Sequence, residues 1–401
     1  MEFRPIISAL TRHKTSSVLV IIQIGVTLAI VVNATFIIKQ RIDRTNRPTG
    51  MDVDNMIVAV VRGIEDDYDP LASILRDLDA IRSMSGIRAV TTTNSVPLGG
   101  SGSSTGLRSI PDESTASVPT GTFIMTETAL ETLGTSLVAG RNFYPEEIVH
   151  YVPGTTGTPT AILVTKALAD KLYPDGDALG KPAYWGSTES STIIGILGHM
   201  QNAWVDWGDT DQLHIRPGMT AYTTHRYLIR TQPGEVDRLL PLVEEKLVEL
   251  DANRIIKYVR SHRDIVDQSY QIDTLMVRIL VTVIVILVGL TSLVILGLVS
   301  YHVVQRTRQI GTRRALGATR SDILRYFLTE NWIITTAGAL LGSLLTVAIS
   351  FAMETSFELP RLDMNYLLVS ILLLWCISQF SAWFPARRAA TVSPAIATRS
   401  V

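Results

Sequence analysis

Sulfur chemistry and charge are both scarce in this sequence of 401 residues. The single cysteine, Cys376, excludes an intrachain disulfide, a CxxC redox pair and a zinc site built from cysteines. Charged residues make up 18% of the chain, whereas roughly 25% is typical of soluble domains. The composition therefore argues against a wholly soluble protein, and the length allows two or three domains.

Signatures of catalysis and metal binding are also missing. The seven histidines show neither H-x-x-x-H nor HExxH spacing, which helical zinc sites require. Asp206, Asp209 and Asp211 lack the residue order of a calcium-binding loop. We therefore expect no catalytic residue and no metal site in this chain, which argues against a membrane-anchored hydrolase.

Four stretches contain no aspartate, glutamate, lysine or arginine over a length that can cross a bilayer, which takes about 20 residues of helix. They are residues 15–38, 279–305, 331–353 and 364–386. The first is longer than the apolar core of a signal peptide, and no A-x-A cleavage site follows it. We therefore expect four transmembrane helices, the first of which stays attached as an anchor.

Charge is distributed unevenly along the chain. Residues 48–272 hold 18 lysines and arginines against 29 aspartates and glutamates, so this region would repel phosphates and nucleic acid is not an expected partner. The positive-inside rule places the arginine-rich connection after the second run in the cytoplasm and the acidic residues 354–363 outside. Both termini are then cytoplasmic and residues 48–272 are outside, although Lys39, Arg41, Arg44 and Arg47 alone would favour the opposite side.

The long region between the first two spans predicts an α+β domain. Residues 53–61, 71–81 and 87–93 have the pattern of strand, helix and strand, and Asp69 with Pro70 supplies the helix start. The same order recurs over residues 227–230, 236–247 and 254–260. The glycine- and serine-rich residues 99–106 are predicted to be a flexible loop.

Residues 261–300 predict how this domain joins the second span. Ser261 and Asp264 have the spacing of a capping box, so a helix should begin at about His262. A helix unbroken from there to Ser300 would extend about 58 Å, against about 30 Å of hydrocarbon. Nearly half would then protrude as a stiff stalk. The alternative is a break near Tyr270.

The basic connection after the second span contains glycines but no P-loop. Gly311 and Gly317 are one residue too far apart for GxxxxGK[ST], and no lysine follows. The chain is therefore not expected to hydrolyse ATP by that route. Within the spans, Gly338 and Gly342 form a small-xxx-small pair, which we expect to pack helices of the same chain.

The sequence RTRQIGTRRALGATRSDILRYFLTEN at residues 306–331 resembles the coupling-loop motif of MacB/FtsX-type permeases, the membrane subunits of type VII ABC transporters. FPARRAATVSPAIATR at residues 384–399 resembles the family's basic C-terminal signature. Residues 133–143, 161–181, 192–198 and 227–240 resemble the MacB-type periplasmic core. Gln309 departs from the glutamate that is usual in the family, and residues 95–120 and 200–225 match no pattern of it.

The resemblance implies an α+β membrane protein: four transmembrane helices with a large extracytoplasmic α+β domain inserted between helices 1 and 2. A separate ABC ATPase subunit would bind ATP and Mg, and this chain itself would bind no cofactor. The residues expected to contact that ATPase, as a short helix, are Gly311, Arg313, Arg314, Ala315, Leu316, Gly317 and Ala318. Work on a periplasmic substrate would be done by mechanotransmission, without carrying the substrate through the membrane.

Partners and location follow from the same resemblance. The expected partners are the ATPase, a second permease as homo- or heterodimer, a periplasmic adaptor protein and membrane lipids, in the bacterial inner membrane. Efflux or export is the favoured role. A lipoprotein-release or cell-division-type FtsX-like permease is the first alternative, and a membrane sensor is a weaker one because two further spans count against it.

The expected organisation assigns every residue to one segment. The segments are a cytoplasmic amphipathic helix (1–14), TM1 (15–38), the periplasmic MacB-like core domain and stalk (39–272), TM2 (273–305), the cytoplasmic coupling loop (306–330), TM3 (331–353), a periplasmic loop (354–363), TM4 (364–386) and a cytoplasmic tail (387–401).

Overall fold

The computed structural model describes residues 14–64, 67–152, 157–251, 253–357 and 362–391. The chain divides into two compact units. Residues 1–45 and 273–401 form the membrane unit, and residues 46–272 form the α/β unit. Except for Lys14, the amphipathic helix predicted over residues 1–14 lies outside the described residues.

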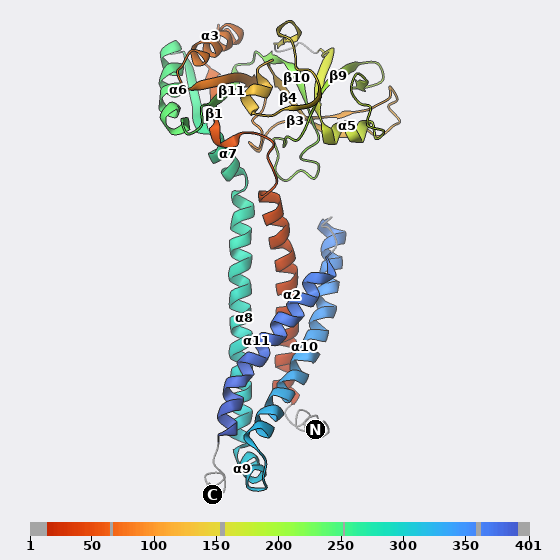
Figure 1. Ribbon diagram of the computed structural model, residues 1–401, viewed down its shortest axis with the longest axis vertical. Helices are drawn as coiled ribbons and strands as arrows, with labels where there is room; N and C mark the ends of the chain where they lie inside the picture. Colours follow the sequence, from red (N-terminus) through yellow and green to blue (C-terminus); the bar gives the residue numbers. More distant parts are fainter. Residues whose placement is uncertain (1–13, 65–66, 153–156, 252, 358–361, 392–401) are drawn as a thin grey trace. The chain divides into compact units, whose positions relative to one another are not determined.

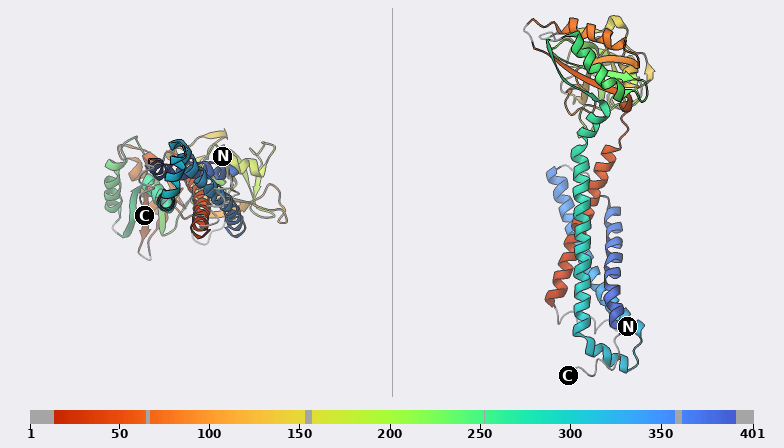
Figure 2. Two further views of the ribbon diagram at one scale, coloured as in Figure 1. Left: turned by 90° about the horizontal axis from the view of Figure 1, so that it is seen from below. Right: turned by 90° about the vertical axis from the view of Figure 1, so that its left-hand side faces the viewer.

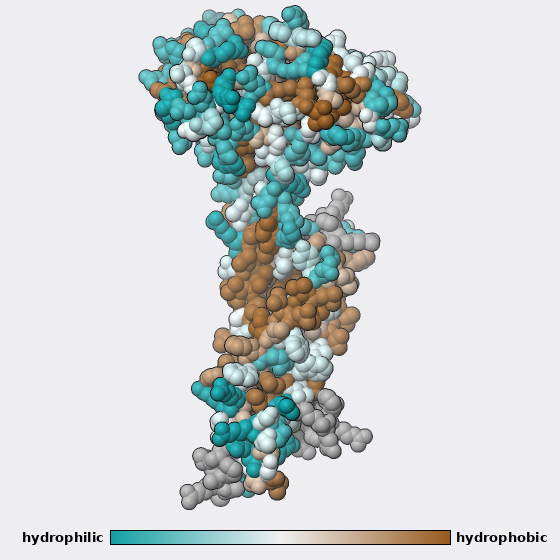
Figure 3. Space-filling view, in the orientation of Figure 1, coloured by the Kyte–Doolittle hydropathy of each residue, from teal (hydrophilic) through white to brown (hydrophobic). Residues whose placement is uncertain are grey.

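The membrane unit is built from long apolar helices (Figure 1). They are α2 (Lys14–Thr45), α8 (Gln271–Gln305), α10 (Arg320–Phe357) and α11 (Met364–Ala390), and the short α9 (Thr307–Ala315) lies between α8 and α10. Within the described part of the chain, these four long helices have the length and composition to cross a membrane. The predicted number of spans is thus confirmed. Apolar side chains gather on the surface of these helices (Figure 3).

Helices α2 and α10 pack closely against each other (Figure 2), and small residues allow this close packing. A Cβ atom at Gly338 would lie 2.6 Å from Cγ2 of Ile24, and one at Gly342 would lie 2.8 Å from the carbonyl oxygen of Gly25. The small-xxx-small pair therefore packs helices within the chain, as predicted. In contrast, only 11% of an apolar 18-residue stretch of α8 is buried within the chain, against 44% of the corresponding stretch of α2.

The α/β unit contains one mixed sheet, which has twelve strands in the described residues. The strands are β1 (Met56–Gly63), β2 (Ile87–Thr93), β3 (Ser103–Leu107), β4 (Val118–Met125), β5 (Leu137–Gly140), β6 (Val149–Tyr151), β7 (Ala161–Thr165), β8 (Pro182–Tyr184), β9 (Ser190–Leu197), β10 (Leu213–Thr220), β11 (Thr224–Thr231) and β12 (Arg254–Ser261). Their order is β12-β1-β11-β2-β4-β10-β7-β9-β5, with β3 on β4, β6 on β10 and β8 on β9. The helices are α3 (Pro70–Arg82), α4 (Ala129–Leu133), α5 (Lys166–Leu172), α6 (Val236–Leu250) and α7 (His262–Ser269).

The two predicted β-α-β repeats are present and interlock. β1, α3 and β2 form the first, and β11, α6 and β12 form the second. The order β12-β1-β11-β2, with antiparallel neighbours, is that of the split β-α-β fold. Its helices α3 and α6 share a core with these strands, into which Ile74, Leu239 and Val243 pack. The remaining strands, β3 to β10, are inserted between β2 and β11.

The prediction of a flexible loop at residues 99–106 is wrong in its second half. β3 occupies residues from Ser103 onward and pairs antiparallel with β4, for example Thr105 with Thr120. Composition alone favoured a loop, but pairing with a long neighbouring strand supplies the backbone with partners and overrides that local preference.

The prediction of an unbroken stalk helix is also wrong. Ser261 caps α7 as predicted, since its hydroxyl accepts a hydrogen bond from the N–H of Asp264 at 3.0 Å. However, α7 ends at Ser269 and α8 begins at Gln271. Tyr270, between them, is buried in a small apolar cluster of the α/β unit, and its hydroxyl donates to Oε1 of Gln201 at 3.2 Å. These contacts hold Tyr270 in a non-helical conformation, so the alternative of a break there is the one observed.

Candidate functional site

The coupling loop predicted over residues 306–330 contains helix α9, which ends in a tight turn. The N–H of Ala318 donates to the carbonyl of Arg313 at 3.0 Å, and the N–H of Gly317 donates to that of Arg314 at 3.2 Å. This pair of bonds is the Schellman arrangement, in which the residue after the helix takes a left-handed backbone conformation. Gly317 has φ = +100°, which side chains with a Cβ atom disfavour, so the turn requires glycine at this position.

The next helix begins with a matching cap. The hydroxyl of Thr319 accepts from the N–H of Asp322 at 3.2 Å, and Oδ2 of Asp322 accepts from the N–H of Thr319 at 2.9 Å. This is a capping box in which aspartate takes the place of the usual glutamate. Only residues 316–319 separate α9 from α10, so the two caps together fix the reversal of the chain.

The structure divides the seven predicted coupling residues into an inner and an outer set. Gly311 is buried beside Ile310, so it does not belong to the exposed surface of α9, and its contact with the ATPase stays a prediction. Arg314 is half-buried, and its Nη1 donates to the carbonyl oxygen of Ala390 at the end of α11, at 3.1 Å. Arg314 thus supplies a hydrogen-bond donor to a carbonyl at the helix terminus and joins α9 to α11.

The outer set forms an exposed patch, defined as Arg313, Ala315, Leu316 and Gly317. The helix ends at Ala315, so Leu316, Gly317 and the half-buried Ala318 lie in the turn and not in the predicted helix. The side chain of Leu316 is 84% exposed. The guanidinium of Arg313 lies over the ring of Tyr326 at 5.0 Å, a contact that orders the arginine before any partner binds. Gln309 is also exposed.

A buried charged cluster that the sequence did not reveal lies behind this patch. Nη1 of Arg306 donates to Oε2 of Glu330 at 2.9 Å and to the hydroxyl of Tyr326 at 3.2 Å. Nδ1 of His302 lies 3.3 Å from Oε1 of Glu330. The cluster therefore connects three parts of the chain: His302 on α8, Arg306 between α8 and α9, and Glu330 on α10. One signal was available: Arg306 directly follows one charge-free run, and Glu330 directly precedes the next.

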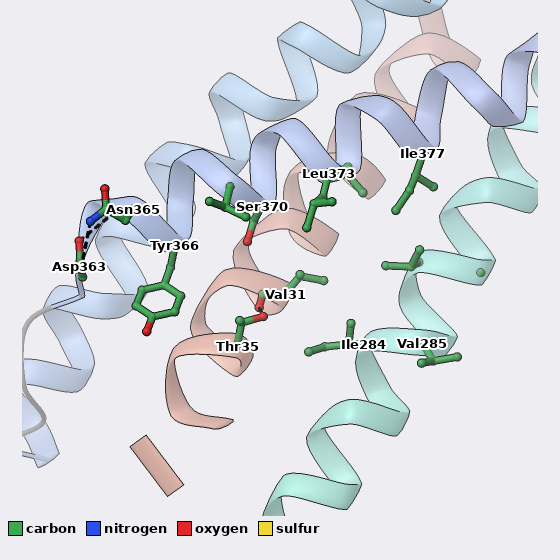
Figure 4. Close-up of a pocket in the computed structure, with 14 residues that line it drawn as sticks. Val31, Thr35, Ile284, Val285, Asp363, Asn365, Tyr366, Ser370, Leu373 and Ile377 are labelled. Atoms are coloured by element: carbon green, nitrogen blue, oxygen red, sulfur yellow. Dashed lines mark hydrogen bonds between the residues drawn. The ribbon is translucent and has the colours of Figure 1, made fainter. Parts of the chain in front are cut away.

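A groove of about 800 Å³ lies between α2, α8 and α11 (Figure 4). Its walls are mostly apolar, with Val31, Ile284 and Leu373 among them. Polar groups gather near the start of α11, where Asp363 accepts a hydrogen bond from the backbone N–H of Asn365 at 3.0 Å. Such a groove can hold an apolar chain. Among the described residues, no group of three or more histidines, cysteines, aspartates and glutamates has the arrangement of a metal site.

Comparison with known proteins shows what this chain is similar to. Residues 281–394 match the family described as FtsX-like permease C-terminal, and they include α9, the capped turn and Glu330. The predicted resemblance of the chain to the MacB/FtsX-type permeases is thus confirmed.

The similar proteins are curated MacB sequences. "Macrolide export ATP-binding/permease protein MacB" of Campylobacter jejuni is 40% identical over 116 residues, which cover 28% of this chain and 18% of that protein. The protein of the same name from Chromobacterium violaceum is 25% identical over 281 residues, 65% of this chain and 40% of that protein. The chain thus spans well under half the length of these relatives.

Solved structures with similarity to the chain include the periplasmic region of MacB from Actinobacillus actinomycetemcomitans. Its TM-score is 0.35 and its identity 12%, over 54% of this chain and 92% of that one. The extracellular domain of the ABC-type transporter YknZ from Gram-positive bacteria has a TM-score of 0.32 and 12% identity, over 50% of this chain and 98% of that one. These scores are too low to support an inference about function.

Proposed function

We propose that this chain is the permease of an ABC transporter of the efflux or export type, and that a separate ATP-binding subunit drives it from the cytoplasmic side by docking on the exposed patch of α9. The observation that carries the proposal is the exposure of Leu316. Its side chain is large, apolar and 84% exposed, and it lies next to the exposed Arg313 in a segment outside the charge-free runs, so burial of this side chain against a partner would contribute favourable free energy to docking. ATP and Mg would bind to that partner.

The contacts behind the patch support a mechanical role. Arg314, near the end of α9, contacts the end of α11. Arg306, directly before the start of α9, contacts Glu330 on α10. Buried ion pairs are costly to break by removing one partner, so α9 should move together with the helices it holds. A displacement of α9 by nucleotide-driven closure of the ATPase would then move the spans, and a substrate outside the membrane would be moved without crossing it.

The remaining partners and the location belong to the same proposal. The exposed apolar side of α8 would pack in the bilayer against a second permease, identical or a sister chain, because α8 buries little of its apolar surface within the chain. Lipid acyl chains would fill the groove between α2, α8 and α11. Both termini would lie in the cytoplasm of a bacterial inner membrane, the α/β unit in the periplasm, and an adaptor protein would contact that unit.

Leu316→Glu tests the docking assignment most directly. We expect the variant, co-expressed with the ATP-binding subunit that co-purifies with the wild type in detergent, to lose that subunit and the stimulation of its ATP hydrolysis. Arg314→Glu is less suitable, because Arg314 also holds Ala390. Val248→Glu is the matched control, since Val248 is 56% exposed on α6 of the α/β unit. Retention of the ATPase by Leu316→Glu, with full stimulation, would show that the patch is not the docking surface.

A further inference from the structure

A second candidate site lies in the inserted part of the α/β unit. It is a cavity of about 330 Å³, within the range of about 300–1,000 Å³ that small-molecule pockets occupy. Its lining includes Ile124, Tyr151, Trp185, Glu189, Arg216 and Tyr222. Its size at the low end of the range limits it to a small ligand.

Arg216 is held rigidly in this cavity. Its guanidinium lies between the rings of Tyr151 and Trp185, 5.0 Å from each centroid. Its Nη2 donates to the carbonyl oxygen of Gly157 at 2.5 Å. Gly218 on β10 makes room for this arrangement, because a Cβ atom there would lie 2.4 Å from a ring atom of Tyr151. The cation is therefore ordered in advance, which lowers the entropy cost of binding an anion.

Arg216 also has no counter-ion among the residues that the structure describes. Within the described part of the chain, no carboxylate lies within 4.0 Å of its guanidinium, and its Nε is buried without a hydrogen-bond partner. His214, two residues earlier on the same strand, is buried, and this burial followed by the charge of Arg216 lowers the pKa of His214 to about 3. A neutral histidine cannot compensate the charge. An incoming carboxylate could, because the planar guanidinium fork matches its geometry.

Glu189 supplies the opposite charge on the wall of the same cavity. It is exposed, it accepts a hydrogen bond from the hydroxyl of Thr158, and no cation among the described residues pairs with it. Tyr222, 44% exposed, and Ile124 offer apolar surface beside the charged groups. The cavity therefore presents one cation, one anion and an apolar wall. A dianion such as phosphate would be repelled by Glu189.

We propose that this cavity binds a free α-amino acid with an apolar or aromatic side chain. Arg216 would hold its carboxylate, Glu189 would accept hydrogen bonds from its ammonium, and Tyr222 with Ile124 would contact its side chain. The proposal does not depend on how the membrane unit is driven, so it stands or falls independently of the coupling role of α9.

Calorimetric titration of the full chain in detergent with three forms of one probe tests the site. L-phenylalanine carries both charged groups, N-acetyl-L-phenylalanine lacks the ammonium, and L-phenylalaninamide lacks the carboxylate. We expect L-phenylalanine to bind and each altered form to bind at least about tenfold more weakly, since a hydrogen bond to a charged group contributes about 1.5–3 kcal/mol. Equal binding of the three forms, or no binding of L-phenylalanine at millimolar concentration, would overturn the proposal.

Variants assign the two charges. Arg216→Gln should remove the discrimination between L-phenylalanine and its amide, whereas Glu189→Gln should remove the discrimination between L-phenylalanine and its N-acetyl form. Arg238→Gln, at an exposed position on α6, should change neither. Glu189 is exposed, so its variant keeps the test valid even if Arg216→Gln fails to fold. Binding of D-glucuronate in place of L-phenylalanine would show a sugar-acid site and refute the amino-acid assignment.

Discussion

At the scale of single residues, the α/β unit depends on a buried ion pair. Asp77 on α3 and Arg254 on β12 are fully buried, and Nη1 of Arg254 donates to Oδ2 of Asp77 at 2.5 Å. Tyr227 donates to the same oxygen at 2.6 Å. Burial, and then the negative charge of Asp77, raise the pKa of Tyr227 well above its ordinary value, so the phenol remains a donor. The second guanidinium nitrogen donates to the carbonyl of Leu247 on α6.

We predict that Arg254→Met lowers the free energy of unfolding by about 3–5 kcal/mol, because it leaves the charge of Asp77 buried without its partner. Urea unfolding followed by tryptophan fluorescence measures this. Arg76→Met is the matched control, since its pair with Asp251 is partly exposed and such pairs contribute about 0–1 kcal/mol. An equal effect of the two variants would contradict the prediction.

The buried histidines predict a dependence of stability on pH. Burial lowers the pKa of His262 to about 4 and, with the charge of Arg216, that of His214 to about 3. Below about pH 6.5 the unfolded chain takes up protons that the folded histidines do not. Stability should therefore fall as the pH decreases from about 6.5 to about 4, by up to about 1.4 kcal/mol per pH unit for each histidine.

Unfolding midpoints at pH 7 and pH 5 check this dependence. His262→Gln should reduce the difference between the two midpoints, because glutamine can replace the hydrogen bond to Pro97 but does not titrate. His150→Gln, at an exposed position, should leave the difference unchanged. The explanation fails if all three proteins show the same difference.

At the scale of elements, packing of α10 on α2 gives an unusual prediction for glycine. Alanine is favoured over glycine in a helix by about 1 kcal/mol, yet a Cβ at Gly342 would lie 2.8 Å from backbone of α2. We expect Gly342→Ala to lower the thermal unfolding midpoint in detergent, because overpacking typically costs about 1–3 kcal/mol. Gly297→Ala on α8, where the added Cβ meets no atom within 4 Å apart from the adjacent backbone of its own helix, should be neutral or stabilising. Equal midpoints for the two variants would contradict the packing argument.

Local patterns predicted most elements, and tertiary contacts explain the failures. The charge-free runs located the spans. Asp69 predicted the start of α3, and its side chain accepts hydrogen bonds from the N–H groups of Leu71 and Ala72 in that helix. The break at Tyr270 was only the alternative expectation, because local patterns do not show that Gln201, far along the chain, holds the tyrosine. The interlocking of the two β-α-β repeats was likewise not predicted, since strand order depends on pairs distant in sequence.

For the coupling residues, too, local patterns predicted the element and tertiary contacts explain what was missed. The resemblance located α9, and the glycine of its turn is explained by the backbone it requires. The sequence could not show that Gly311 is buried or that Arg314 contacts Ala390, 76 residues away. Patterns of charge and spacing name the residues of an element, but its exposed face is set by the neighbours on which it packs.

At the scale of the whole molecule, the proposed topology can be measured with single cysteines. In a Cys376→Ser background, Ser114→Cys in the α/β unit and Thr312→Cys on α9 are both at exposed positions. A membrane-impermeant maleimide added to intact spheroplasts should label the first and should label the second only after the membrane is opened. Labelling of both from the same side would contradict the topology, because residues 48–272 and α9 would then share a compartment.

The four-residue turn between α9 and α10 has a consequence for how this chain can vary. Successive residues of a helix are rotated by about 100° around its axis, so one residue added between Ile323 and Tyr326 would turn the rest of α10 by that angle relative to its cap. Glu330 would then point away from Arg306, and Gly338 away from Ile24. The capped turn thus sets the helical phase of the span that follows it, which makes the start of α10 intolerant of insertions that a longer loop would absorb.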